Sequence, residues 1–316
     1  TITNGIDLAG DGGMVWIKGR SSGTTPLVFD TERGTGKTIF TSTTSANQTY
    51  NPSSQDLMSF NSDGFTAGTE WTGPANRAAL PTVSWTFKKQ TKFFDIVTYT
   101  GTGVIRTVNH NLGSVPGMVI VKRTDSSGSW RVYHRGSDAT APENYYLTLN
   151  ATDQAGTGGG VVWNDTAPTN SVFTVGANNS VNDSGGTYVA YVFAHDTASD
   201  SRVKCGTFSG QPTSVNLGWE PQWLLCKRTD STSNWVLLDN KRVTGGSENY
   251  LYANTNDAEQ TSFDLVDFTS TGFDVLSGLA GTQIYMAIRA STATDSAITW
   301  PSSVKWPSGV APTTPA

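Results

Sequence analysis

Two Glu residues and two Trp residues stand in nearly identical phrases and are the first candidates for chemistry. Glu143 and Glu248 each begin the tripeptide Glu-Asn-Tyr, and Trp130 and Trp235 close the phrases KRTDSSGSW and KRTDSTSNW. Two carboxylates roughly 5–10 Å apart are the catalytic groups of a glycoside hydrolase. An aromatic ring beside Asp and Ser on a loop is the usual chemistry for binding a sugar.

The two Trp phrases give the ligand-binding candidates Trp130 with Asp125 and Trp235 with Asp230. The same phrases are also explained without a ligand. An apolar run ends at Lys122, turn formers follow, and an alternating run starts at Trp130, which predicts a β-hairpin. The corresponding stretch near the N-terminus, KGRSSGTTPLVFD, has neither the Asp nor the Trp, which argues against a shared catalytic role.

Other chemistry finds little support. Duplication of the Glu-Asn-Tyr phrase favours a structural role over an active site made once. The three His residues, at positions 110, 134 and 195, have no zinc-like spacing, and the scattered Asp residues form no calcium-loop pattern. The Gly-rich stretches 34–38 and 156–163 lack the full phosphate-loop or dinucleotide spacing. We therefore predict no catalytic residue, no metal and no cofactor.

Four landmarks recur in one order along the chain. They are an apolar run ending in Lys (14–18, 118–122, 223–227), a strand-like phrase (37–40, 144–147, 249–252), an isolated Phe (Phe65, Phe173, Phe273) and a closing alternating strand. This order predicts three copies of a unit of about one hundred residues, which is a usual domain size.

Short strands between frequent turn signals predict an all-β fold. We expect three tandem antiparallel β-sandwich repeats, jelly-roll-like, at 1–90 (unit one), 91–197 (unit two) and 198–291 (unit three). An extended Pro- and Trp-rich C-terminal segment is expected at 292–316. Single helical turns are expected at 54–60 and 257–263.

Composition excludes some classes of partner. Charged residues make up 15% of the chain and the net charge is −5, which disfavours nucleic acid. No apolar run approaches the roughly 18 residues that span a bilayer, so we predict no membrane span. Cys205 and Cys226 align with apolar positions of another unit, so both are expected as buried free thiols. A bridge between neighbouring strands is the alternative.

Two stretches resemble a known family. The segment ITWPSSVKWPSGVAPTTP is similar to a motif near the ends of tailed-phage tail fibre and related virion proteins, although this chain stops at Ala316 without an aromatic-rich closing strand. The residues that carry the motif are Trp300, Pro301, Val304, Trp306, Gly309 and Pro312. The repeat units, including FNSDGF and HNLGSVPGMVIVKR, resemble repeats in fibre or surface proteins of marine phages.

The resemblance implies a non-enzymatic structural protein of a phage virion, assembled in the host cytoplasm. A tail fibre or appendage that binds the host surface, with glycan among the expected ligands, is the leading hypothesis. It implies a homo-oligomer, with a trimer favoured, in contact with other virion proteins. A capsid decoration protein is the alternative, and a glycan-degrading enzyme of tailspike type is the alternative from another class.

Overall fold

The computed structural model describes residues 1–21, 23–50, 57–68, 80–244 and 246–289. Strands β1–β23 account for nearly all of its regular structure, with three short helical turns: η1 (Pro142–Asn144), α1 (Gly159–Val162) and α2 (Asn179–Asn182). The prediction of an all-β, antiparallel fold is therefore confirmed. The expected C-terminal segment, with its Trp-Pro motif, lies outside the described residues.

Each unit contains one five-stranded sheet, which we call its large sheet. In unit one its order is β5 (Gln48–Thr49), β4 (Lys37–Phe40), β3 (Leu27–Asp30), β2 (Gly13–Gly19) and β8 (Thr82–Lys88). In unit two the order is β13 (Leu147–Thr148), β12 (Arg131–His134), β11 (Pro116–Arg123), β15 (Thr187–Ala194) and β9 (Phe94–Thr100). In unit three it is β20 (Ser247–Tyr252), β19 (Val236–Thr244), β18 (Pro221–Arg228), β23 (Thr282–Arg289) and β16 (Val203–Ser209).

A small sheet covers the outer face of each large sheet. The small sheets are β1 (Ile2–Thr3), β7 (Gly64–Ala67) and β6 (Leu57–Asn61) in unit one, β10 (Arg106–Asn109) and β14 (Val172–Val175) in unit two, and β17 (Thr213–Asn216), β22 (Gly272–Val275) and β21 (Val266–Thr269) in unit three. The isolated Phe of each unit, Phe65, Phe173 or Phe273, is buried on the small sheet. Each ring fills the space between the two sheets of its unit.

The three apolar runs form the strands β2, β11 and β18, and they are buried on both faces. In β2, Met14 and Trp16 point into a cluster shared by all three units, whereas Val15 and Ile17 point into a cluster confined to unit one. The alternation repeats in β11 and in β18. A continuous apolar run thus gives a strand that has two buried faces.

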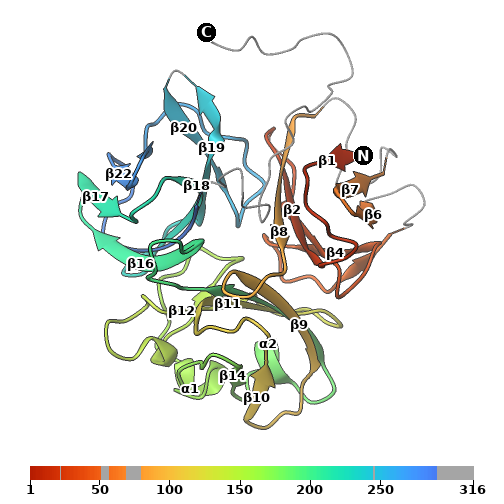
Figure 1. Ribbon diagram of the computed structural model, residues 1–316. Helices are drawn as coiled ribbons and strands as arrows, with labels where there is room; N and C mark the ends of the chain where they lie inside the picture. Colours follow the sequence, from red (N-terminus) through yellow and green to blue (C-terminus); the bar gives the residue numbers. More distant parts are fainter. Residues whose placement is uncertain (22, 51–56, 69–79, 245, 290–316) are drawn as a thin grey trace.

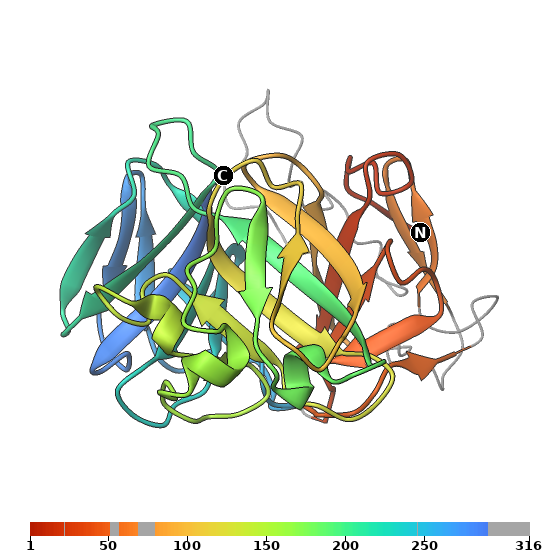
Figure 2. The same cartoon turned by 90° about the horizontal axis from the view of Figure 1, so that it is seen from below.

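The inner faces of the three large sheets meet in one cluster, which we call the shared core. Figures 1 and 2 show the three lobes, red to orange, yellow to green and cyan to blue, arranged around a common centre. Rings from different units touch there, since Trp223 lies 5.5 Å from Phe87 and 6.4 Å from Trp16, centroid to centroid. The units pack side by side and do not form a row of separate sandwiches.

Two local expectations are wrong. Residues 57–61 form strand β6, and 257–263 contain no helix, whereas residues 54–56 are not described. No helix among the described residues has the length and apolarity required to cross a bilayer.

The two cysteines are free and buried, as predicted. Cys205 lies opposite Met286 and faces the shared core, whereas Cys226 lies opposite Tyr285 and faces the outer cluster of unit three. The two thiols therefore lie on opposite faces of one sheet, which excludes the alternative of a bridge between them.

Candidate functional site at the joints between the units

The three Lys residues that end the apolar runs lie where one unit meets the next. Their side chains are at most 1% exposed. Each ammonium donates to a backbone carbonyl of another unit: Lys18 to Thr255 at 2.7 Å, Lys122 to Thr44 at 3.1 Å and Lys227 to Thr152 at 3.2 Å. The contacts run from unit one to three, from two to one and from three to two, so they close a ring. We call these three contact regions the joints.

Backbone hydrogen bonds of the hairpin after each Lys complete the joint. Each hairpin exchanges two N–H···O bonds with a loop of the neighbouring unit. The donor and acceptor pairs are Gly128 with Thr44, Asn47 with Thr124, Ser233 with Thr152, Ala155 with Thr229, Gly23 with Asn256 and Glu259 with Arg20. The repeated KRTD phrase is therefore used to join units.

The structure corrects the prediction that Trp130 and Trp235 bind a ligand. The residues are 1% and 0% exposed, so neither ring is available for stacking on a sugar in this conformation. Trp130 Nε1 donates to the carbonyl of Phe40 and Trp235 Nε1 to that of Thr148, both at 3.0 Å. A buried indole N–H normally finds such an acceptor. The sequence placed both rings on turns because it could not show the neighbouring unit that covers them.

Asp125 and Asp230 lie on the exposed hairpin tips, as expected. Arg123 holds the first through an ion pair at 3.1 Å, and the carboxylate of Asp230 accepts from Arg228 Nε at 2.5 Å. Each carboxylate also accepts a backbone N–H from the start of β15 or β23, so the tips are fixed in place. Their role in binding a ligand stays a prediction.

A second set of buried polar residues lies at equivalent positions on β3, β12 and β19: Asp30, His134 and Asp239. Each is 0% exposed. Asp30 accepts from Tyr191 of unit two at 2.6 Å, and Asp239 accepts from Trp85 of unit one at 2.9 Å. These donors occupy matching places on β15 and β8.

His134 stands where units one and three have Asp, and it packs against a residue of unit three that cannot donate a hydrogen bond. The place held by Trp85 and Tyr191 in the other units is held by Met286, which has no strong hydrogen-bonding group. His134 Nε2 therefore donates to the backbone carbonyl of Tyr285 at 2.9 Å, while Nδ1 accepts from the N–H of Gly136. Burial lowers the pKa of His134 to about 3, which agrees with this neutral ring.

Arginines balance the two buried aspartates. Arg33 pairs with Asp30 and Arg242 with Asp239, each at 2.6 Å. The sequence signal for these pairs is Asp-x-x-Arg, which occurs in units one and three. Its counterpart in unit two, from His134, ends in Ser137, which agrees with the absence of a buried carboxylate there.

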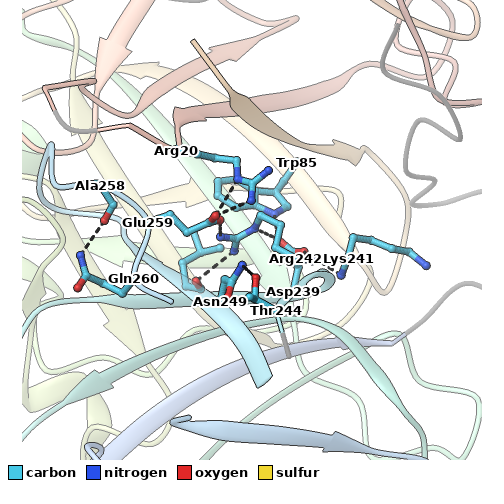
Figure 3. Close-up of polar contacts among 11 residues, drawn as sticks. Arg20, Trp85, Asp239, Lys241, Arg242, Thr244, Asn249, Ala258, Glu259 and Gln260 are labelled. Carbon is cyan, nitrogen blue, oxygen red and sulfur yellow. Dashed lines mark hydrogen bonds and ion pairs between the residues drawn. The ribbon is translucent and has the colours of Figure 1, made fainter. Parts of the chain in front are cut away.

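Pro26 stands in unit one at the place that Trp130 and Trp235 hold in the other units. The joint between units one and three carries an ion cluster, shown in Figure 3. One oxygen of Glu259 accepts from Arg20 at 2.6 Å, and the other accepts from Arg242 at 2.6 Å. The Arg242 guanidinium also lies 5.5 Å from the centre of the Trp85 ring. Two arginines and two carboxylates from two units thus neutralise one another.

The pairing of Glu143 with Glu248 is wrong by one residue. Strand register makes Leu147 equivalent to Leu251, which is one residue away from the alignment of the two Glu-Asn-Tyr phrases. Glu143 lies in η1 of unit two, whereas Glu248 is buried in β20 of unit three. Glu248 instead belongs to a group with Asp264 and Asp267 whose arrangement is suited to holding a metal ion.

The comparisons with known proteins place the chain in a family. Residues 2–290 match DUF7483, described as a domain of unknown function. The chain belongs to this family. Its single domain spans all three units, in line with the shared core. No curated protein matches the chain. One similar solved structure, the crystal structure of the STIV MCP, is 9% identical, covers 61% of this chain and 95% of its own, and has a TM-score of 0.18. That likeness is too low to carry an argument.

The buried lysines predict an alkaline rise in stability. Burial lowers the pKa of Lys18, Lys122 and Lys227 to about 8, below the ordinary 10.5. Between these pH values each of the three lysines binds more protons in the unfolded chain than in the folded one, so each makes the free energy of unfolding increase with pH. Burial also raises the pKa of buried Cys and Tyr side chains, which acts in the opposite direction over the same range. The lysine contribution is therefore measured as a difference: from pH 8 to pH 10, the free energy of unfolding of Lys122→Met in urea should fall relative to that of the unaltered protein. An unchanged slope in that variant would contradict the assignment.

Loss of Arg242 should be far more damaging than loss of an exposed arginine. Arg242→Met leaves the buried Asp239 without its cation and should lower the free energy of unfolding by about 3–5 kcal/mol. Arg228→Met, the control, removes an ion pair whose partners are 30% and 44% exposed. It should cost about 1 kcal/mol or less. Chemical denaturation of both variants measures the difference, and equal losses would refute the role given to the ion cluster.

Proposed function

We propose that this protein is a non-enzymatic structural component of a phage virion, a tail fibre or appendage. One observation carries the proposal. The polar side chains that recur among the units, including Lys18, Lys122 and Lys227, are used to hold the units together. The side chains that recur among the units therefore serve the packing of the units and not a reaction. The resemblance of the repeats and of the C-terminal motif to phage fibre and surface proteins supplies the biological setting.

The architecture suits a particle protein for a physical reason. Three large sheets packed on one core give a rigid body, while loops of every unit stay at the surface. The tips that hold Asp125 and Asp230 are fixed by ion pairs and backbone bonds, so they present polar groups in a constant arrangement. A host-surface glycan is the ligand we propose for these tips, with carboxylates binding sugar hydroxyls.

The oligomeric state follows from the same proposal. A fibre protein implies a homotrimer and further virion proteins as neighbours. The shared core already closes within one chain, so a trimer would form through the outer surfaces and would not be required for folding.

Purified phage particles test the proposal. Antibody raised against this chain should label intact virions in negative-stain electron microscopy, at the tail fibres. Label on the capsid would favour the decoration alternative. Absence of the chain from particles, or release of reducing sugar from host polysaccharide by the purified protein, would overturn the proposal.

A further inference from the structure

Unit three contains a group of three carboxylates, and no second group of this kind occurs in the part of the chain that the structure describes. Glu248 lies on β20 of the large sheet, Asp264 on the segment before β21, and Asp267 on β21 of the small sheet. One ligand atom from each residue lies within 4.8 Å of the others. Glu143, the Glu of the matching phrase in unit two, lies in the helical turn η1 and not on a strand, and it belongs to no such group among the described residues.

Two oxygens of the acidic group are buried and lack a partner. Glu248 is 8% exposed, and its Oε1 accepts the N–H of Phe268 at 3.1 Å. Asp264 Oδ2 accepts the hydroxyl of Ser247 at 2.9 Å. Glu248 Oε2 and Asp264 Oδ1 are both buried without a hydrogen bond. Leaving such atoms unpaired is costly, so a bound cation that satisfies both of them would stabilise the folded state.

Negative charge accumulates around these atoms. Asp267 lies directly opposite Asp274 in the register of β21 and β22, an arrangement of like charges that destabilises a sheet. Burial first, and then neighbouring carboxylates, raise the pKa of both Glu248 and Asp267. Among the described residues, none of the four carboxylates forms an ion pair with Lys, Arg or His.

We propose that Glu248, Asp264 and Asp267 bind a divalent cation, and that Ca²⁺ is preferred. The protein ligands are hard carboxylate oxygens, which suit Ca²⁺ or Mg²⁺ and not thiolate- or imidazole-seeking metals. Ca²⁺ accepts six to eight oxygens in flexible geometry, whereas Mg²⁺ demands a near-ideal octahedron. Asp264 and Asp267 are half-buried, so water can complete the shell from the solvent side.

A cation there would connect the two sheets of unit three. Glu248 belongs to the edge strand of the large sheet and Asp267 to the edge strand of the small sheet. Binding would therefore stabilise the outer layer of this unit. The inference does not depend on the role of the protein in a virion.

The test uses the whole chain and compares unfolding temperatures without and with Ca²⁺. The substitutions should raise the unfolding temperature in EDTA and abolish the increase that Ca²⁺ causes. In EDTA, Glu248→Gln and Asp267→Asn should unfold at a higher temperature than the unaltered protein, because each removes charge from a repulsive group. In 5 mM CaCl₂ the unaltered protein should gain about 2–6 °C, and the two variants should gain nothing. Glu143→Gln is the matched control, since it removes a half-buried Glu outside the group. It should keep the full Ca²⁺ response.

Isothermal titration calorimetry with CaCl₂ and with MgCl₂ completes the experiment. We expect one Ca²⁺ site in the unaltered protein and in Glu143→Gln, and no measurable binding of Ca²⁺ in the two other variants. No heat and no shift in unfolding temperature with Ca²⁺ would overturn the proposal. A Ca²⁺ response retained in both variants would also overturn it, and equal affinity for Mg²⁺ would overturn the stated preference.

Discussion

Burial of the second face of the middle strands is the constraint on which the rest of the structure depends. In β2, β11 and β18, successive side chains are apolar on both sides. The small sheet of each unit covers one side only. The other side, which includes Trp16, Ile120 and Trp223, must be removed from water by another unit. Because each unit faces this requirement, three of them satisfy it together by closing around a shared core.

The polar groups at the joints determine how the units meet. Apolar faces alone pack in many ways, whereas a buried ammonium must find carbonyls and a buried carboxylate must find donors. Lys122 donates to the carbonyl of Thr44, and Asp30 accepts from Tyr191 and Arg33. A buried charge is weak evidence for stability, and its clearest use is to fix one arrangement against others. The replacement of Asp by His134 opposite Met286 shows that the joint keeps a hydrogen bond even when the donor is lost.

Much of the fold was accessible from the sequence, because the apolar runs, the turn residues and the recurring Phe are local signals. The hairpin at Lys122 and the burial of both cysteines were predicted in this way. The shared core was not predicted. An apolar run indicates that both faces of a strand are buried, but it does not show which element packs against the second face. Trp130 was misplaced for the same reason.

The acidic group was missed for a different reason. Glu248 and Glu143 both precede Asn-Tyr, which aligns them in the sequence, but pairing of the strands makes Leu147 equivalent to Leu251 and moves that alignment by one residue. Only the register brings Glu248 to Asp264 and Asp267, which stand far from it in the sequence. Spacing along the chain carries no trace of such a contact, so it was invisible before the structure.

The shared core is tested most directly by native-state hydrogen exchange after one substitution in unit three. Trp223→Ala removes a ring that touches Trp16 and Phe87 of unit one, and should cost about 3–5 kcal/mol. If the core is shared, amide exchange should accelerate to a similar extent, by about 100-fold or more, in β2, β11 and β18. Acceleration confined to peptides of unit three would show that the units open independently, and would contradict the account.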